Sequence, residues 1–160
     1  MAIWHKGWVD IGDGVFIGGS CFIALIKNAQ PGAGDPSLTI GDRTQIGSHF
    51  HVTCGGAMVI EEDVLISNRV YIGDSIHGYE DPYRPVLAQP MEFRGNIHLK
   101  AGCFIGANVV VHPGVTIGEH AVVGASAVVL SDVPAHAVAV GHPARVVKRF
   151  DEDSGKWSST

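Results

Sequence analysis

The feature that most constrains this chain is an aliphatic residue at every sixth position. From Leu99 to Val129, Ile, Val or Leu opens six successive hexads without a break in register. The same spacing runs for three hexads each from Ile11, Ile40 and Ile60, which makes fifteen hexads. Because Ile, Val and Leu account for only 40 of the 160 residues, composition alone does not explain this register.

Two other positions within the hexad also recur along the chain. A small or β-branched residue usually stands four places after the aliphatic one, as Val15 and Cys103 do. Glycine directly follows the aliphatic residue at Gly12, Gly18, Gly41, Gly47, Gly73, Gly106, Gly118 and Gly124. An α-helix would need apolar spacings of three and four. A short strand that ends in a tight corner fits better, with the aliphatic side chain inside and glycine tolerating the corner backbone. The repeat therefore predicts an all-β chain wound into a β-helix.

Three hexads make one coil of triangular section, so we expect about five stacked coils, roughly 24 Å tall. Irregular segments at 29–37 and 78–96 interrupt the stack, and the second is expected to protrude as a loop. A two-residue register shift between Val52 and Ile60 predicts a widened corner. We expect one domain over residues 1–150, capped by a strand or short helix at 144–150, and a polar, mobile tail at 151–160.

Charge and composition exclude several classes of function. The formal charge is −5 and the pI about 5.9, so a nucleic-acid backbone is a poor partner. No window is apolar enough to span a bilayer, and residues 1–10 do not resemble a signal peptide. The three cysteines are odd in number and widely spaced, which fits neither a disulfide framework nor a zinc motif. We expect a soluble, cytoplasmic protein with reduced thiols.

Several segments resemble one known family. The runs IGANVVVHPGVTIG (105–118), VVGASAVVLSDVP (122–134) and GHPARVVKRF (141–150) resemble the bacterial hexapeptide-repeat acyltransferases. YIGDSIHGYEDPYRPVLAQP (71–90) is similar to the histidine-bearing loop of their sugar O-acetyltransferases of surface polysaccharide synthesis. The resemblance covers about residues 40–157. It implies a left-handed parallel β-helix, although the usual crossover rule would favour the other hand. It also implies a homotrimer with the active site between subunits, and transfer of an acetyl group from acetyl-CoA to a sugar hydroxyl without a metal.

His77 is the candidate general base. It stands where the repeat stops and the segment 78–96 begins, and an ordinary histidine pKa near 6.5 suits proton removal at neutral pH. A surface histidine is the structural alternative, and its agreement with the family loop favours the catalytic role. Glu80 or Asp81 is close enough in sequence to orient the imidazole, but a solvated carboxylate is the simpler interpretation of both. Asn68 and Tyr79 are candidate contacts for the acceptor, although each could equally be a corner or loop residue.

The resemblance also implies where coenzyme A would bind. In the family the carrier lies along a corner of the last coils, and the matching positions here are Gly106, Ala107, Asn108, Ala125 and Ser126. Small residues at hexad corners also serve the fold, so this assignment depends on the resemblance alone. Three basic residues suit the phosphates of coenzyme A, unless they only form a solvated face: Arg145, Lys148 and Arg149.

Two departures from the family affect this site. Phe104 stands where relatives commonly have Trp, and Ala107 where the sugar acetyltransferases have Ser. The second change removes a hydroxyl donor, so backbone amides would have to stabilise the oxyanion. Cys103 occupies an inward hexad position and is expected in the core rather than as a nucleophile.

Alternatives remain open at this point. His49 and His51 form an HxH pair that strand alternation would aim outward, and carbonic anhydrases of the gamma class use this fold with three histidines. The other histidines do not reproduce that arrangement. An acyltransferase for a non-sugar alcohol or an amine, or a non-catalytic β-helix binding module, also fits the repeat.

Overall fold

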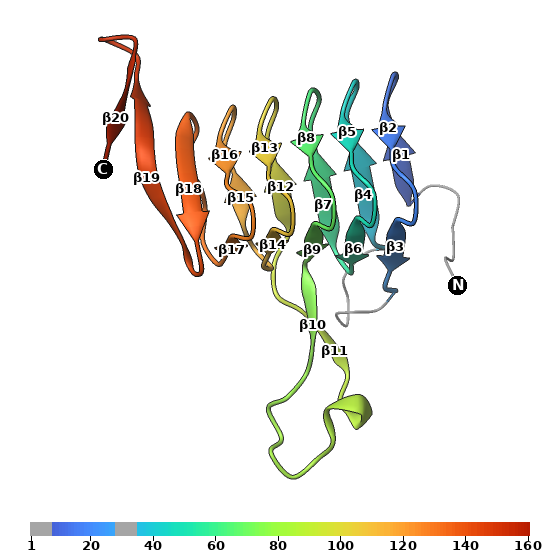
Figure 1. Ribbon diagram of the computed structural model, residues 1–160. Helices are drawn as coiled ribbons and strands as arrows, with labels where there is room; N and C mark the ends of the chain where they lie inside the picture. Colours follow the sequence, from blue (N-terminus) through green and yellow to red (C-terminus); the bar gives the residue numbers. More distant parts are fainter. Residues whose placement is uncertain (1–7, 28–34) are drawn as a thin grey trace.

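The computed structural model describes residues 8–27 and 35–160, and it confirms the β-helix. The chain winds in successive turns, and each turn contributes one short strand to each side of a three-sided prism (Figure 1). Strands on one side pair in parallel with the strands of the turns before and after. The predicted segment 29–37 falls mostly at residues 29–34, which lie outside the described residues, and β4 begins at Ser37.

The strands form three main sheets. The first sheet has the order β1 (Val9–Ile11), β4 (Ser37–Ile40), β7 (Ala57–Ile60), β12 (Ile97–Leu99) and β15 (Thr116–Ile117). The second has the order β2 (Phe16–Ile17), β5 (Gln45–Ile46), β8 (Leu65–Ile66), β13 (Phe104–Ile105), β16 (Val122–Val123), β18 (Ala137–Gly141), β19 (Ala144–Asp151) and β20 (Lys156–Ser159). The third has the order β3 (Phe22–Leu25), β6 (His51–Cys54), β9 (Tyr71–Gly73), β14 (Val110–Val111) and β17 (Val128–Val129).

The aliphatic residue that opens each hexad points into the prism, as predicted. From Ile40 to Val129 these side chains are at most 1% exposed, and Ile23 is also buried. In the first coil, Ile17 is partly buried and Ile11 is 44% exposed. The second inward position holds smaller side chains in several hexads, such as Cys103 and Ala121, whereas Phe50 fills it in the second coil.

The repeated glycines were predicted to tolerate an unusual backbone conformation at the corners, and this prediction is wrong. The left-handed backbone falls three residues after the aliphatic residue, for example at Asn108 (φ 59°) and His120 (φ 52°). The glycine directly after the aliphatic residue is required by its neighbour in the next coil. A Cβ on Gly118 would lie 2.2 Å from the backbone nitrogen of Ala135. The coils stack too closely at this point for any side chain.

The segment 78–96 leaves the prism as predicted, but it is more regular than a loop. β10 (Ser75–His77) and β11 (Met91–Phe93) pair antiparallel, and a 3-10 turn, η1 (Val86–Ala88), lies near the tip. Figure 1 shows this hairpin projecting from the end of β9. The widened corner at 55–56 lies directly beneath it, because its two glycine amides bond to the Asp74 side chain at the root of the hairpin.

The C-terminal segment differs from the prediction in one respect. The cap at 144–150 is a strand, β19, which pairs antiparallel with β18. The tail expected at 151–160 instead turns back as β20 and pairs with β19, where the rings of Phe150 and Trp157 lie 5.6 Å apart. An aromatic contact thus holds a segment whose polar composition predicted mobility.

Over residues 8–27 and 35–160, no helix is long and apolar enough to cross a membrane.

Candidate active site

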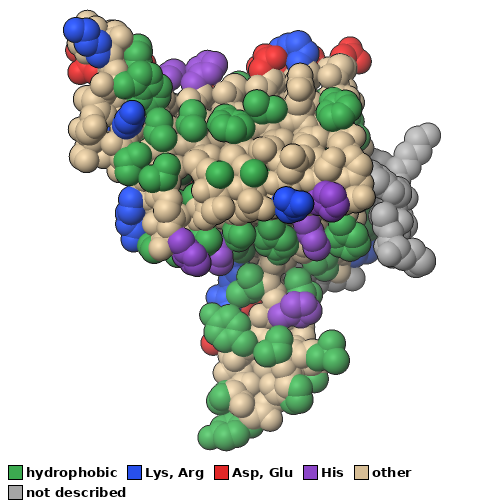
Figure 2. Space-filling view, in the orientation of Figure 1, with side chains coloured by type: hydrophobic (Ala, Val, Ile, Leu, Met, Phe, Trp, Pro, Cys, Tyr) green, Lys and Arg blue, Asp and Glu red, His purple; other side chains and the backbone are tan. Residues whose placement is uncertain are grey.

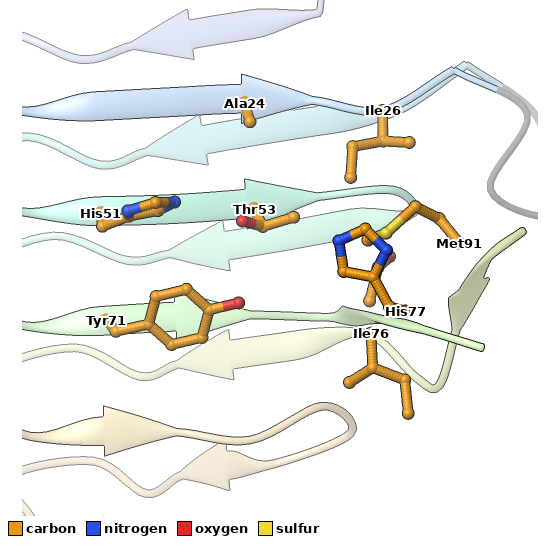
Figure 3. A pocket seen from close by; sticks show the side chains of 9 residues that line it. Ala24, Ile26, His51, Thr53, Tyr71, Ile76, His77 and Met91 are labelled. Carbon is orange, nitrogen blue, oxygen red and sulfur yellow. The ribbon is translucent and has the colours of Figure 1, made fainter. Parts of the chain in front are cut away.

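His77 lies at the end of β10, where the hairpin leaves the prism. Its side chain is exposed and borders a hollow of about 520 Å³ on the third sheet. Figure 3 shows the imidazole beside Met91, at the end of the hollow beyond Thr53 and Tyr71. The residues that line it are Ala24, Ile26, His51, Thr53, Tyr71, Ser75, Ile76, His77 and Met91. In the space-filling view, histidine side chains lie at this level, between the prism and the hairpin (Figure 2).

The floor of the hollow is continuous with a row of rings. Phe22, His51 and Tyr71 stand at the same register on β3, β6 and β9. The ring centroids of Phe22 and His51 are 4.7 Å apart, and those of His51 and Tyr71 are 5.2 Å apart. Each of these residues immediately precedes an inward aliphatic residue, so alternation turns its side chain outward. Neither Tyr71 nor Thr53 was predicted as a site residue, although this alternation could have indicated Tyr71.

The HxH interpretation is only half right. His51 faces outward from β6, but His49 is in the turn before it, with a left-handed φ of 61°. The two side chains therefore do not share the face of one strand. In the described part of the chain, no three His, Cys, Asp or Glu side chains are grouped so that they could hold a metal ion.

The carboxylates that follow His77 are engaged elsewhere. Glu80 forms an ion pair with Arg94 at 3.1 Å, and Asp81 accepts a hydrogen bond from the Tyr83 amide at 3.0 Å. The pKa of Arg94 is raised by its hydrogen bond to Glu80 and by the charge of Glu92. These contacts order the hairpin itself rather than the His77 ring.

The two predicted acceptor contacts do not reach the hollow that His77 lines. Asn68 stands at a corner before β9, and its side-chain oxygen accepts the Ser48 amide at 2.8 Å. Tyr79 borders a different hollow of about 270 Å³, together with Arg94 and His112. Ile76 on β10 lines both hollows and so separates them.

The predicted coenzyme A positions gather at one corner, between the second and third sheets. Gly106, Ala107 and Asn108 join β13 to β14, and Ala125 and Ser126 join β16 to β17. The Ser126 amide donates to the Ala107 carbonyl at 2.8 Å, which stacks the two turns. The missing side chain of Gly106 is explained by the fold, since a Cβ there would lie 2.6 Å from the Ala125 nitrogen.

Two backbone amides at this corner donate no hydrogen bond to the described residues. Earlier along the same edge, the Asn68 side chain accepts the Ser48 amide of the preceding coil. In the next two coils the position equivalent to Asn68 is occupied by Ala107 and Ala125, whose methyl groups cannot accept a hydrogen bond. By the same geometry a side-chain oxygen at position 125 would accept a hydrogen bond from the Ala107 amide, and the Ala125 methyl group leaves that amide uncapped. The Ala125 amide likewise donates no hydrogen bond among the described residues. The alanines thus leave donors free for a ligand.

The basic cluster on β19 divides between two faces. Arg145 pairs with Val140 and Lys148 with Val138, and these two valines are on the outward face of β18. Arg149 pairs with Ala137, which is buried, so it lies on the opposite side. The structure therefore brings two of the three predicted basic residues to one face.

Two of the three cysteines, Cys54 and Cys103, are buried. Cys103 is fully buried, and burial raises the pKa of its thiol to about 12. Burial, together with the nearby Asp74 carboxylate, raises the pKa of Cys54 to about 12 as well. The core role expected for Cys103 is confirmed.

Comparison with known proteins agrees with this architecture. Residues 96–131 match the family model described as bacterial transferase hexapeptide (six repeats). WbbJ of Escherichia coli (strain K12), which carries the name of a lipopolysaccharide biosynthesis O-acetyl transferase, is 30% identical over 126 residues, 75% of this chain and 64% of WbbJ. The chain thus spans less than two thirds of this relative's length.

Two solved structures share the fold. The hexapeptide-repeat acetyltransferase VCA0836 of Vibrio cholerae, in complex with acetyl-CoA, is 27% identical with a TM-score of 0.71, covering 88% of this chain and 70% of that one. A point mutant of AntD, an N-acyltransferase of Bacillus cereus, in complex with dTDP and coenzyme A, is 25% identical with a TM-score of 0.74, covering 96% and 79%. The chain therefore has the hexapeptide repeat and the left-handed β-helix of the bacterial hexapeptide-repeat acyltransferases, as its sequence predicted.

Proposed function

We propose that this protein transfers an acetyl group from acetyl-CoA to a hydroxyl of a sugar or polysaccharide precursor, with His77 as the general base. The observation that carries the proposal is an exposed imidazole without a hydrogen bond or ion pair in the described chain, at the edge of an uncharged hollow. An unengaged imidazole is free to take a proton from a ligand. The likeness to WbbJ supports a hydroxyl acceptor, and the likeness to VCA0836 supports acetyl-CoA.

The free amides at Ala107 and Ala125 suit the thioester half of the reaction. Backbone N–H groups in fixed positions can hold the carbonyl oxygens of the carrier and the oxyanion that develops on attack. They replace the hydroxyl that Ala107 lacks relative to the sugar acetyltransferases. Arg145 and Lys148, on the outward face of β19, would bind the phosphates, whereas the register turns Arg149 away.

His77 and the candidate carrier corner lie at opposite ends of the strands of the third sheet. The candidate carrier corner precedes β14 and β17, whereas His77 follows β9, beyond the other end of the strands. One chain alone therefore separates the base from the thioester. We propose a homotrimer in which His77 of one subunit faces the last coils of its neighbour. A solution mass equal to one chain in an active preparation would contradict this assembly.

The chemistry is a direct transfer. The acceptor hydroxyl gives its proton to His77 as its oxygen attacks the thioester carbonyl, and the carbonyl oxygen takes the negative charge. The intermediate collapses, the carbon–sulfur bond breaks, and the thiolate takes the proton back from the His77 imidazolium. The products are the acetyl ester and free coenzyme A, and no covalent acyl-enzyme forms.

An amine acceptor is the second candidate, because AntD is an N-acyltransferase. The nature of the product separates the two, since hydroxylamine cleaves an acetyl ester readily and leaves an amide intact. The polysaccharide pathway and the cytoplasmic location expected from the sequence stay predictions.

The test is thiol release from acetyl-CoA with a panel of saccharides, comparing the wild type with His77→Ala. His120→Ala is a matched control, because His120 lies at a corner between the first and second sheets. The proposal predicts a loss of roughly 10² to 10⁴ in turnover for His77→Ala alone. Equal turnover in both variants would remove His77 from the mechanism, and no acetyl-CoA binding at all would favour a non-catalytic module.

A further inference from the structure

The phenol of Tyr71 lies along β9 over a residue that has no side chain. If Gly73 carried a Cβ, that atom would be 2.5 Å from Tyr71 Oη and 2.9 Å from Cζ. Because non-bonded atoms do not approach so closely, the phenol keeps this orientation only while residue 73 is glycine. Figure 3 shows the hydroxyl directed towards the side of the hollow where His77 and Ile76 lie.

Neighbouring strands hold the Tyr71 ring in the same orientation. On one side the His51 ring packs against it at 5.2 Å, and on the other Val110 of β14 stands at the same register. Tyrosine has few rotatable bonds, so a ring packed between neighbours presents its hydroxyl at little further entropic cost. The Tyr71 hydroxyl is therefore organised before any ligand enters.

The hydroxyl of Tyr71 is also unused within the described residues, where it makes no hydrogen bond. Ser75, which lines the same hollow, differs because its hydroxyl already donates to Asp74 at 2.7 Å. A phenol hydroxyl can both donate and accept. It is thus available to a hydroxyl group of a ligand that lies between Tyr71 and His77.

The residues that line the hollow include no Lys, Arg, Asp or Glu. A phosphate or carboxylate placed there would lose its hydration without gaining a counter-charge. An uncharged ring with several hydroxyls would keep its hydrogen bonds through Tyr71 and Thr53 and pack its apolar face on the row of rings. The part of the lining that this subunit supplies therefore favours a neutral polyol over an anionic ligand.

We propose that Tyr71 is a specificity-determining residue whose hydroxyl binds one ring hydroxyl of a neutral sugar, while His77 takes the proton from another. This inference depends on the proposed acetyl transfer and adds the chemical class of the acceptor portion that enters the hollow. Gly73 belongs to the same device, because its missing side chain is what lets the phenol point along the strand.

The test compares Tyr71→Phe with the wild type, using thiol release from acetyl-CoA with galactose, glucose and N-acetylglucosamine, and with galactose 1-phosphate as an anionic probe. Tyr71→Phe keeps the ring and removes one neutral hydrogen bond, so the acceptor KM should rise roughly threefold to tenfold. The KM for acetyl-CoA should not change. Tyr83→Phe is the matched control, because Tyr83 is 96% exposed on the hairpin.

A second variant, Gly73→Ala, should raise the acceptor KM at least as much, since the phenol must move. An unchanged acceptor KM in Tyr71→Phe would overturn the proposal, as would equal use of galactose 1-phosphate and galactose. If wild-type protein binds acetyl-CoA but uses none of the neutral sugars, the polyol class is wrong while acetyl transfer stands. Normal sugar turnover in His77→Ala would instead contradict the proposed function and leave the result for Tyr71 to be judged by its own KM.

Discussion

The carboxylate of Asp74 accepts the backbone amide of Gly55 at 2.7 Å, across one full turn of the β-helix. The same side chain accepts the Gly56 amide at 2.9 Å and the Ser75 hydroxyl at 2.7 Å, and it is completely buried. These bonds fasten the widened corner to the point where the chain leaves the prism for the hairpin. Asp74 thus anchors the strand that carries His77, three residues further on.

We expect Asp74→Ala to lower the free energy of unfolding by about 3 kcal/mol, because it leaves two amides in a buried corner without an acceptor. The hairpin should also become more sensitive to limited proteolysis. Urea unfolding and a protease digest followed by mass spectrometry measure both effects.

A matched control for this substitution is Asp132→Ala. The Asp132 side chain also accepts an amide of a neighbouring coil, that of Thr116 at 2.7 Å, but at an exposed site away from the hairpin. The loss for Asp132→Ala should be about 1 kcal/mol. Similar losses in the two variants, with unchanged proteolysis of the hairpin, would contradict the anchoring role of Asp74.

Close stacking of the coils predicts a strong contrast between two glycines. Gly118→Ala would place a Cβ 2.2 Å from the Ala135 nitrogen, whereas a Cβ on Gly19 would have no atom within 4 Å. We expect the first substitution to cost about 2 kcal/mol of stability and the second to leave stability unchanged within about 0.5 kcal/mol. Thermal unfolding of both variants checks this, and equal melting temperatures would refute the account of the corners.

Direct transfer predicts that Cys103 is dispensable for the chemistry. Because burial raises its thiol pKa to about 12, the reactive thiolate is scarce at pH 8, and iodoacetamide should not modify it in the folded protein. Cys103→Ala should retain the wild-type kcat while losing about 1 kcal/mol of stability from the smaller core side chain. Loss of turnover in a folded Cys103→Ala protein, or an acetylated Cys103, would point to an acyl-enzyme.

The register of β19 predicts unequal roles for its basic residues. Arg145→Ala and Lys148→Ala should each weaken coenzyme A binding several-fold, with an effect that salt reduces, since both face outward beside Val138 and Val140. Arg149→Ala, on the other side of the strand, should change the affinity much less. Calorimetric titration with coenzyme A measures the three values, and equal effects of all three would show that the strand register does not select the phosphate contacts.

Much of this fold could be predicted because an aliphatic residue at every sixth position marks a buried site. The hexad residues from Ile40 to Val129 are all buried, so the period alone located the core and the strands. The hand of the coil came from the family resemblance, because an aliphatic period is the same in both hands. The role of the glycines was misjudged because the sequence does not display the distance between neighbouring coils.

The site was less predictable than the fold because it depends on which corner each side chain reaches. His77 was chosen because the loop that follows it resembles that of the family, and it lines the hollow. Asn68 instead accepts a hydrogen bond from the Ser48 amide and does not face the hollow. Tyr71 was not predicted, because the position of its phenol over Gly73 is a three-dimensional contact that the sequence does not display. The strand β20 was not predicted, because its pairing with β19 brings Trp157 into contact with Phe150 across a turn, and the sequence does not display that contact.

The central claim is that His77 of one subunit acts on a thioester held at the last coils of another. Ala125→Asn would offer a side-chain oxygen to the free Ala107 amide, as Asn68 does for Ser48, and should disable the carrier corner while His77 remains. The decisive measurement is thiol release by co-expressed mixtures of His77→Ala and Ala125→Asn subunits, with mixed oligomers verified by native mass spectrometry. The two inactive variants should regain activity when they assemble together, whereas mixed oligomers as inactive as their parents would show that the two residues do not act across a subunit interface.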